Sequence, residues 1–211
     1  MSFPVELVSI LTGATTRQLS NWRKPPTPLV APEIAVRPRV LYSFRDIVAL
    51  RTLVKLRSEV PLQRIRRAFQ SLQEMDLTDH PSRYTLVTDG SSVFLVEGNE
   101  ATDLVVAPGQ RVIVSLDDVF KPFTNWKGED VVDFLHPRPR LEVRETRMGG
   151  WPTIRGTRVP YDTIANLVRG GDIPAEAVGE YFPTVAPIDV GDAVSFDEQV
   201  SQVGGGEGRT A

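Results

Sequence analysis

The sequence contains no cysteine among its 211 residues. This absence excludes disulfide bonds, thiolate metal sites, cysteine nucleophiles and thiol-based redox sensing. Histidine is nearly as scarce, because the chain has only His80 and His136, each directly before a proline and far apart in the sequence. A histidine-based metal site is therefore not expected, and we predict a protein without metal or cofactor.

Long apolar runs and targeting signals are missing too. No stretch approaches the ~18 consecutive apolar residues of a membrane span, and the first ten residues, MSFPVELVSI, lack the basic start and long apolar stretch of a signal peptide. The sequence also shows no nucleophile with a matching base and no metal cluster. We expect a cytoplasmic protein with no membrane partner and no enzymatic activity.

The charge is distributed unevenly along the chain. Residues 1–80 hold 12 basic and 7 acidic residues, a net charge of +5, whereas residues 81–211 hold 12 basic and 20 acidic residues, a net charge of −8. A basic first part suits a polyanion such as nucleic acid, which an acidic second part would repel. Uneven surface charge without a nucleic-acid partner remains the alternative.

Two short helices are predicted at the N-terminus, separated by a turn. An apolar cluster within residues 5–11 is followed by Gly13 and by Thr15, a good N-cap for a helix from about residue 16 to 23. Leu19 and Trp22 are three apart and face inward, which leaves the polar face outward. Long polar side chains on a short exposed helix can reach base edges and phosphates. We expect DNA contacts from Thr16, Arg17, Gln18, Asn21, Arg23 and Lys24, the alternative being an ordinary solvated helix face.

Residues 24–42 contain five prolines, which forbid a helix and favour an extended excursion in the position of a wing. Arg37 and Arg39 are expected to touch the phosphate backbone from this excursion. Ser43 then caps a helix with Asp46 three residues later, close to a capping box. A further helix starts with Pro61 in its first turn.

The order GATTRQLSNWRK, RVLYSFRDIVALRTLVKLR and PLQRIRRAFQSL resembles the winged helix-turn-helix head of MerR-family DNA-binding regulators, over roughly residues 5–75. The resemblance implies that residues 15–23 are the recognition helix, that the proline-rich excursion is the wing, and that Tyr42 and Arg45 face phosphates. Many family members carry an arginine and a tyrosine in the recognition helix where this chain has Ser20 and Asn21. The long dimerisation helix and the cysteine-bearing effector site are also missing, so effector-driven activation is not expected.

From residue 84 the pattern changes to short β-rich runs. They are separated by Asp89-Gly90, Gly98-Asn99 and Pro108-Gly109, which predicts hairpins. Ser115 is expected to cap a short helix over residues 115–120. We interpret this middle part as a linker that also pairs subunits.

Residues 147–161, RMGGWPTIRGTRVPY, predict short extended pieces and tight turns. Helical patterns follow over residues 161–171, 174–182 and 186–196. Trp151, Ile154 and Val159 are expected to form an edge strand and an apolar seam under these helices. Arg155 and Arg158 are expected to be exposed partner contacts. The glycine-rich end is expected to be flexible.

The pattern GxPxIxGTRVP…IxxLVxxGDIPAEAVxEYFP resembles a small helical domain of undefined biochemical function that is encoded beside bacterial toxin genes, over about residues 149–196. A MerR-like head joined to that domain is similar to one subgroup of VapB-type antitoxins, the partners of PIN-domain ribonuclease toxins. The resemblance implies a homodimer that binds its own operator and neutralises a PIN-type toxin. It also makes Arg209 a candidate toxin contact, because a terminal arginine enters the toxin's acidic site in some antitoxins of this type.

The overall expectation is an α+β chain with four parts. They are a MerR-like DNA-binding domain (1–78), a β-rich linker or dimerisation region (79–146), a small three-helix domain (147–200) and a flexible tail (201–211). Two other functions stay open: a protein-interaction adaptor whose helix-turn-helix has lost DNA binding, as Ser20 and Asn21 suggest, and a stand-alone MerR-like regulator.

Overall fold

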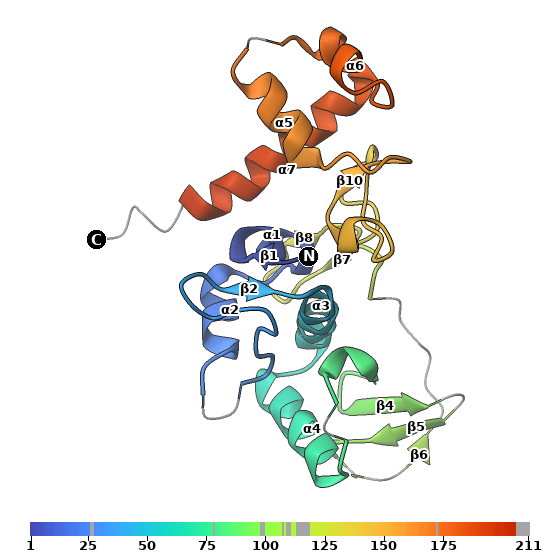
Figure 1. Ribbon diagram of the computed structural model, residues 1–211. Coiled ribbons are helices and arrows are strands. Elements are labelled where there is room, and N and C mark those ends of the chain that lie inside the picture. The colour runs from blue at the N-terminus through green and yellow to red at the C-terminus, as the bar shows by residue number, and fades with distance from the viewer. Residues whose placement is uncertain are drawn as a thin grey trace.

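The computed structural model describes residues 1–25, 28–77, 79–97, 100–106, 108, 111–112, 119–171 and 173–205. The chain belongs to the α+β class, with helices at both ends and small antiparallel sheets between them (Figure 1). Within the described residues, no helix has both the length and the apolar character needed to cross a membrane.

The N-terminal helices start where local signals place them. They are α1 (Val5–Thr12), α2 (Thr16–Trp22), α3 (Phe44–Glu59) and α4 (Leu62–Glu74). Thr15 and Gln18 form a capping box at the start of α2, and Ser43 and Asp46 form another at the start of α3. Because each box satisfies backbone N–H groups that have no partner within the helix, these four residues define where the helices begin. The predicted N-caps Thr15 and Ser43 are confirmed.

The turn between α1 and α2 requires glycine at its first position. Gly13 has a φ of +76°, and a Cβ built there would lie 2.4 Å from Cγ2 of Val131. Both the left-handed backbone and the close approach therefore exclude a larger residue. This contact also brings a strand of the middle part directly against the turn.

The described part of the proline-rich excursion contains no helix. We call its residues 28–40 the wing segment. Its returning end enters β2 (Leu41–Tyr42), which pairs with β1 (Phe3–Pro4) in an antiparallel sheet. Ala35 and Leu41 exchange two backbone hydrogen bonds of 3.2 and 2.8 Å, which close the segment into a hairpin-like loop.

The middle part contains a four-stranded antiparallel sheet in sequential order. It follows the short 3₁₀ turn η1 (Pro81–Arg83) and comprises β3 (Thr85–Thr88), β4 (Val93–Glu97), β5 (Glu100–Asp103) and β6 (Arg111–Val112). The predicted turn at Asp89-Gly90 is confirmed, since Thr88 pairs with Val93 across it. The expected turn at 98–99, Gly109 and the expected helix cap Ser115 lie outside the described residues.

Residues 119–134 return to the N-terminal helices, where the buried Arg51 of α3 holds them. The small sheet of β7 (Phe123–Thr124) and β8 (Asp130–Val131) lies in this stretch. The Arg51 side chain donates to the carbonyl oxygens of Val119, Phe120, Lys121 and Val132, and to that of Leu11 at the end of α1. One side chain thus joins α1, α3 and the returning chain.

The C-terminal part is a strand pair followed by helices. Its elements are β9 (Leu141–Glu142), the 3₁₀ turns η2 (Met148–Gly150) and η3 (Ala175–Ala177), β10 (Thr153–Ile154), α5 (Tyr161–Arg169), α6 (Val178–Tyr181) and α7 (Pro187–Gly205). β9 and β10 form an antiparallel pair, although the boundary expected between the β-rich region (79–146) and the small helical domain (147–200) lies between these two strands. The prediction that the tail is flexible from residue 201 is wrong for residues 201–205, because α7 continues to Gly205.

The extension of α7 has a tertiary cause. Its C-terminal half packs against α1 (Figure 1), and a Cβ at Gly204 would lie 3.4 Å from Cγ of Glu6. Glycine disfavours a helix interior by about 1 kcal/mol, and packing against α1 offsets this cost. Residues 206–211 lie outside the described part.

The two ends of the chain share one hydrophobic core. Phe3 stacks on Trp151 with ring centroids 5.6 Å apart, Trp151 stacks on Tyr161 at 6.4 Å, and Tyr161 meets Phe196 edge-on at 4.9 Å. This aromatic row connects β1 through residue 151 to α5 and α7. The expected apolar seam around Trp151 and Ile154 is therefore present, and it extends into the N-terminal part.

Candidate functional site

The exposed face of α2 carries two of the predicted DNA contacts. Leu19 and Trp22 are 1% and 4% exposed and hold the helix on the core, whereas Arg17 and Asn21 are exposed on the opposite side. Lys24, just beyond the helix, is also exposed and donates from Nζ to Oδ1 of Asn21 at 3.0 Å. Arg17, Asn21 and Lys24 thus form a polar surface at α2.

Gln18 and Thr16 are placed differently from this surface. The Gln18 side-chain oxygen accepts the backbone N–H of Thr15 at 2.8 Å, so it completes the capping box. Only the amide nitrogen of Gln18 is left to reach outward, which limits the base contact predicted for it. Thr16 is half-buried at the first turn of the helix.

The prediction that Tyr42 faces phosphates is wrong. Its side chain is 1% exposed in the core, because β2 pairs with β1 and turns Tyr42 inward opposite Phe3. Burial raises the pKa of the Tyr42 phenol, and the nearby charge of Arg23 opposes this shift. Arg23 itself is half-buried at the C-cap of α2.

The wing segment presents its arginines to solvent. Arg37 and Arg39 are exposed, as are Ile34 and Val36, which are 50% and 59% exposed. Exposed cations beside a hairpin-like loop are suited to contact a phosphate backbone. The expected positions of Arg37 and Arg39 on an exposed loop are thus observed.

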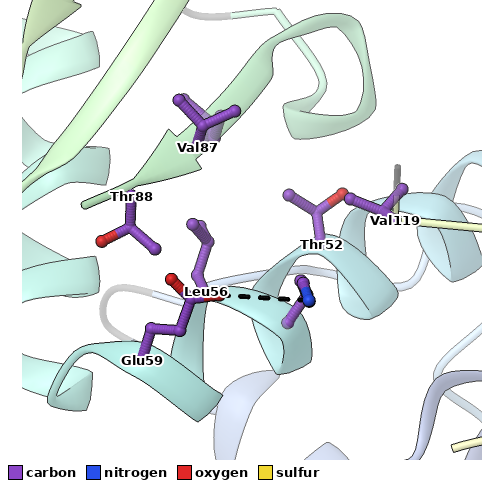
Figure 2. Close-up of a pocket in the computed structure, with 8 residues that line it drawn as sticks. Thr52, Leu56, Glu59, Val87, Thr88 and Val119 are labelled. Carbon is purple, nitrogen blue, oxygen red and sulfur yellow. Dashed lines mark ion pairs between the residues drawn. The ribbon is translucent and has the colours of Figure 1, made fainter. Parts of the chain in front are cut away.

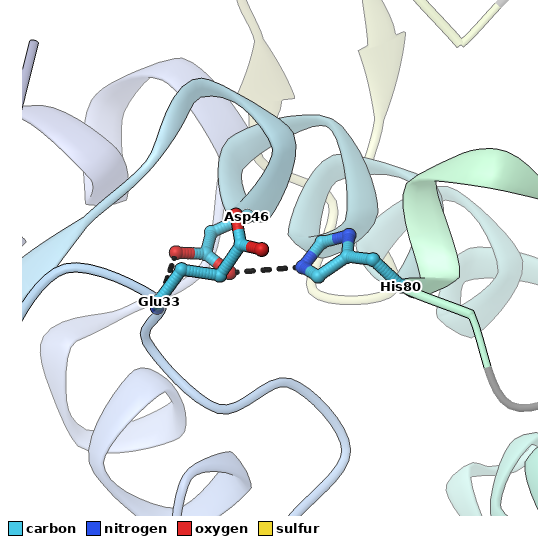
Figure 3. Close-up of side chains that lie close together, drawn as sticks. All are labelled: Glu33, Asp46 and His80. Carbon is cyan, nitrogen blue, oxygen red and sulfur yellow. Dashed lines mark hydrogen bonds and ion pairs between the residues drawn. The ribbon is translucent and has the colours of Figure 1, made fainter.

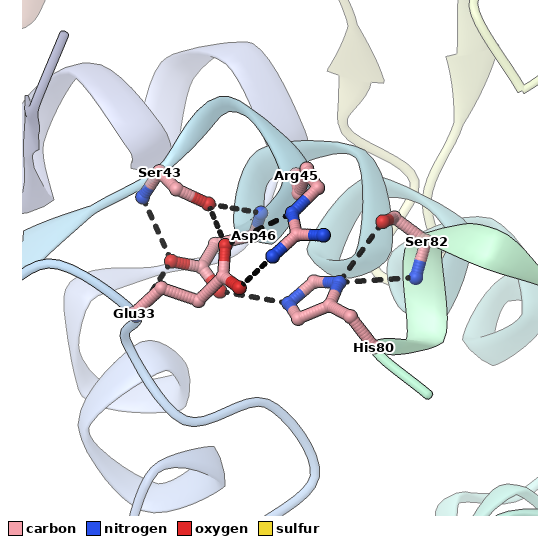
Figure 4. A network of polar contacts seen from close by, with 6 residues as sticks. All are labelled: Glu33, Ser43, Arg45, Asp46, His80 and Ser82. Atoms are coloured by element: carbon pink, nitrogen blue, oxygen red, sulfur yellow. Dashed lines mark hydrogen bonds and ion pairs between the residues drawn. The ribbon is translucent and has the colours of Figure 1, made fainter. Parts of the chain in front are cut away.

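Arg45, the last predicted DNA contact, is tied to the wing segment. Its Nε lies 3.3 Å from Oε2 of Glu33, and its Nη2 contacts Oε1 of the same carboxylate (Figure 4). The Ser43 hydroxyl donates to Oε2 of Glu33 at 2.6 Å. The hydrogen bond from Arg45 is the main cause that lowers the pKa of Glu33, and the same bond raises the pKa of Arg45.

Glu33, the carboxylate of this ion pair, also lies close to Asp46 and His80 (Figure 3). Asp46 is fully buried; its Oδ2 accepts the backbone N–H groups of Glu33 and Ser43 at 2.9 and 2.7 Å, and its Oδ1 lies 3.0 Å from Nε2 of His80. The other ring nitrogen of His80, Nδ1, lies 3.3 Å from the backbone nitrogen of Ser82, from which it accepts a hydrogen bond. Asp46 thereby connects α3, the wing segment and the chain before β3.

Among the described residues, these three form the group of acidic and histidine side chains whose ligand atoms lie close enough together to bind a cation. Glu33, Asp46 and His80 each present one ligand atom, and these atoms lie within 4.8 Å of one another. Each of these side chains already has a partner, which is Arg45, Ser43, His80 or a backbone N–H group. We therefore interpret the cluster as a polar network that holds the wing segment in place. Sequence reasoning missed it, because its members are far apart in the chain and only Asp46 carries a local signal, the capping box.

The predicted partner contacts of the C-terminal part lie on the turn after β10. Arg155 and Arg158 are both exposed. The buried Glu142, 2% exposed, accepts the backbone N–H of Gly156 at 2.9 Å and pairs with Arg144 at 2.9 Å and with Arg147. This carboxylate therefore anchors the turn that carries both arginines. Arg209, the third predicted toxin contact, lies outside the described residues.

Two hollows lie in the surface of the described residues. A cavity of about 50 Å³ between α3 and β3 is lined by Thr52, Leu56, Glu59, Val87, Thr88 and Val119, among others (Figure 2), and has room for only a few waters. A groove of about 260 Å³ between the wing segment and the end of α4 is lined mostly by apolar side chains such as Leu29, Phe69, Leu72 and Leu77. The polar lining of the groove comes from Gln73, Asp79, His80 and Tyr84, and the two ring nitrogens of His80 already contact Ser82 and Asp46.

The comparisons with known proteins concern the C-terminal part and the fold. Residues 141–196 match DUF433, a family described as a protein of unknown function; the match begins at β9 and ends within α7. The crystal structure of Rv2018 from Mycobacterium tuberculosis is similar, with a TM-score of 0.55 and 18% identity, over 91% of this chain and 96% of that one. At this identity the likeness concerns the fold alone. No curated protein sequence matches the chain.

Proposed function

We propose that the chain is an antitoxin that acts in the cytoplasm as a homodimer. In this proposal it represses its own operon by binding operator DNA through α2 and the wing segment, and it neutralises a PIN-type ribonuclease toxin through its C-terminal part. It performs no catalysis. The toxin half rests on the resemblance of residues 149–196 and of the whole arrangement to VapB-type antitoxins.

The exposed polar face of α2 is the observation that carries DNA binding. Arg17 and Asn21 project from a helix whose opposite side, Leu19 and Trp22, is fixed in the core. A rigid short helix with outward arginine and asparagine is suited to phosphate and base contacts in the major groove. The net charge of +5 over residues 1–80 supports the same partner.

Charge reversal tests DNA binding. Arg17→Glu, and Arg23→Glu where it remains folded, should weaken binding to the duplex upstream of the chain's own gene at least ~100-fold, because each replaces attraction to phosphate by repulsion. The measurement is fluorescence anisotropy over a range of salt concentrations. Arg83→Glu makes the same charge change at an exposed arginine before β3 and should have a much smaller effect.

One observation favours the alternative of a protein-interaction adaptor. Gln18 and Tyr42, two residues predicted to contact DNA, are instead committed to a helix cap and to the core. Under this alternative, wild type and Arg17→Glu would both show no binding to DNA, or equally weak binding that is insensitive to salt. Either result would reject the DNA-binding half of the proposal.

The toxin half is tested by co-expression with the product of the neighbouring gene. Arg155 and Arg158 are exposed on a turn whose backbone is held by Glu142, so their guanidinium groups are accessible to carboxylates of a partner. Arg155→Glu with Arg158→Glu should abolish co-purification and leave DNA binding intact. If a ribonuclease still co-purified with this double variant, Arg155 and Arg158 would not be part of the proposed toxin interface.

A further inference from the structure

Arg45 occupies an unusual position for a predicted phosphate contact. It lies in the first turn of α3 with 54% of its side chain exposed, yet its guanidinium is bound through two nitrogens to both carboxylate oxygens of Glu33. Glu33 comes from the wing segment, twelve residues earlier. The predicted DNA contact therefore already holds an anion supplied by the chain itself.

The groups that hold this anion are those that bind phosphate. A guanidinium fork binds a carboxylate or a phosphate oxygen pair with the same two-point geometry. The hydroxyl of Ser43 adds a third donor, 2.6 Å from Oε2 of Glu33, and serine hydroxyls are frequent phosphate donors in protein–DNA complexes. The Glu33 carboxylate is thus placed as a phosphate oxygen pair would be.

We propose that Glu33 competes with a DNA phosphate for Arg45 and the Ser43 hydroxyl, and so lowers the affinity of the chain for DNA. In the free protein the carboxylate occupies both donors. On DNA a backbone phosphate replaces it, and the released carboxylate then repels that phosphate. This inference rests on the proposed DNA binding and assigns a regulatory residue within that surface.

The surroundings allow this exchange without a change of fold. The backbone N–H of Glu33 is held separately, by Oδ2 of Asp46 at 2.9 Å, so the Glu33 side chain can turn away while the wing segment stays in place. The ion pair is exposed, and exposed pairs contribute little to stability because solvent and salt screen them. The lowered pKa of Glu33 keeps its carboxylate charged at neutral pH, so the competitor is present under physiological conditions.

The variant Glu33→Gln removes the negative charge of this side chain while keeping its size and shape nearly unchanged. Glutamine keeps an oxygen that accepts from Ser43 but no longer holds Arg45 as an ion pair. We expect affinity for the upstream duplex to rise about fivefold at low salt. The slope of log affinity against log salt should steepen by nearly one, because the carboxylate released in the wild-type complex retains a cation beside the phosphate and glutamine does not. Anisotropy titrations at several salt concentrations measure both quantities.

The gain must depend on Arg45. In an Arg45→Ala background, Glu33→Gln should raise affinity less than twofold, because the contested cation is gone. The matched control is Glu74→Gln at the exposed end of α4, where Glu74 accepts from Gln70. It makes the same change of net charge away from Arg45 and should leave affinity within about twofold.

Three outcomes would overturn the inference. Wild type and Glu33→Gln could bind DNA equally, Glu33→Gln could gain as much without Arg45, or Glu74→Gln could gain as much as Glu33→Gln. All three leave the proposed DNA binding standing, because wild type still binds. Absence of DNA binding in every variant rejects the proposed function and this inference together, and circular dichroism of each variant verifies that it is folded.

Discussion

Arg51 joins the helices of the N-terminal part to the returning residues 119–132. It is fully buried, and its guanidinium lies 5.3 and 5.5 Å from the ring centroids of Phe123 and Phe134. Its donors bind the carbonyl oxygens of Val119, Lys121 and Val132, and a buried carbonyl oxygen that loses its hydrogen bond costs free energy. The guanidinium lies among several carbonyl dipoles and beside two aromatic rings.

Replacing Arg51 should therefore destabilise the whole chain. Arg51→Lys keeps the charge but loses the planar fork, so it leaves carbonyls unpaired and should lower the free energy of unfolding by about 2–4 kcal/mol. Urea denaturation followed by circular dichroism measures this loss. Arg66→Lys, at an exposed position of α4, should change it by less than about 0.5 kcal/mol. An Arg51→Lys variant as stable as wild type would show that these hydrogen bonds contribute little.

At the scale of elements, the sequence predicted those helix starts and turns that are determined by residues close together in the chain. The capping residues Thr15 and Ser43 and the turn at Asp89-Gly90 act within a few residues, so the helix starts and the first hairpin could be predicted from the sequence. The same holds for the outward face of α2, which follows from the spacing of Leu19 and Trp22.

Features that depend on distant partners could not be predicted in this way. Tyr42 is buried because β2 pairs with the first residues of the chain, and α7 reaches Gly205 because it packs on α1. The ion pair of Arg45 joins residues from two elements with no shared sequence pattern. In each case a tertiary contact decided the outcome, and propensity or charge alone carried no information about it.

At the scale of the molecule, the N-terminal and C-terminal parts are connected through the strip around residues 148–151. Gly150 lies over the ring of Phe44, the first residue of α3, while Trp151 packs between Phe3 and Tyr161. Since the core is continuous, a partner bound to the C-terminal part and DNA bound to α2 would act on one packed unit. The four-part division expected from the sequence describes segments of that unit, and we predict that both ends unfold in one cooperative transition.

The variant Gly150→Ala tests this connection. Gly150 has a φ of +85°, and a Cβ there would lie 2.1 Å from Cδ2 of Phe44, so alanine adds backbone strain and a clash. We expect about 2–4 kcal/mol of destabilisation and a lower Tm for the single transition in calorimetry. Gly156→Ala is the matched control, because Gly156 has a φ of +78° with no atom within 4 Å of its Cβ position, and it should cost only about 1–2 kcal/mol. Strain at a junction within one shared core must destabilise the N-terminal and C-terminal parts together. Two separate thermal transitions, of which Gly150→Ala lowers the Tm of only one, would therefore contradict a shared core.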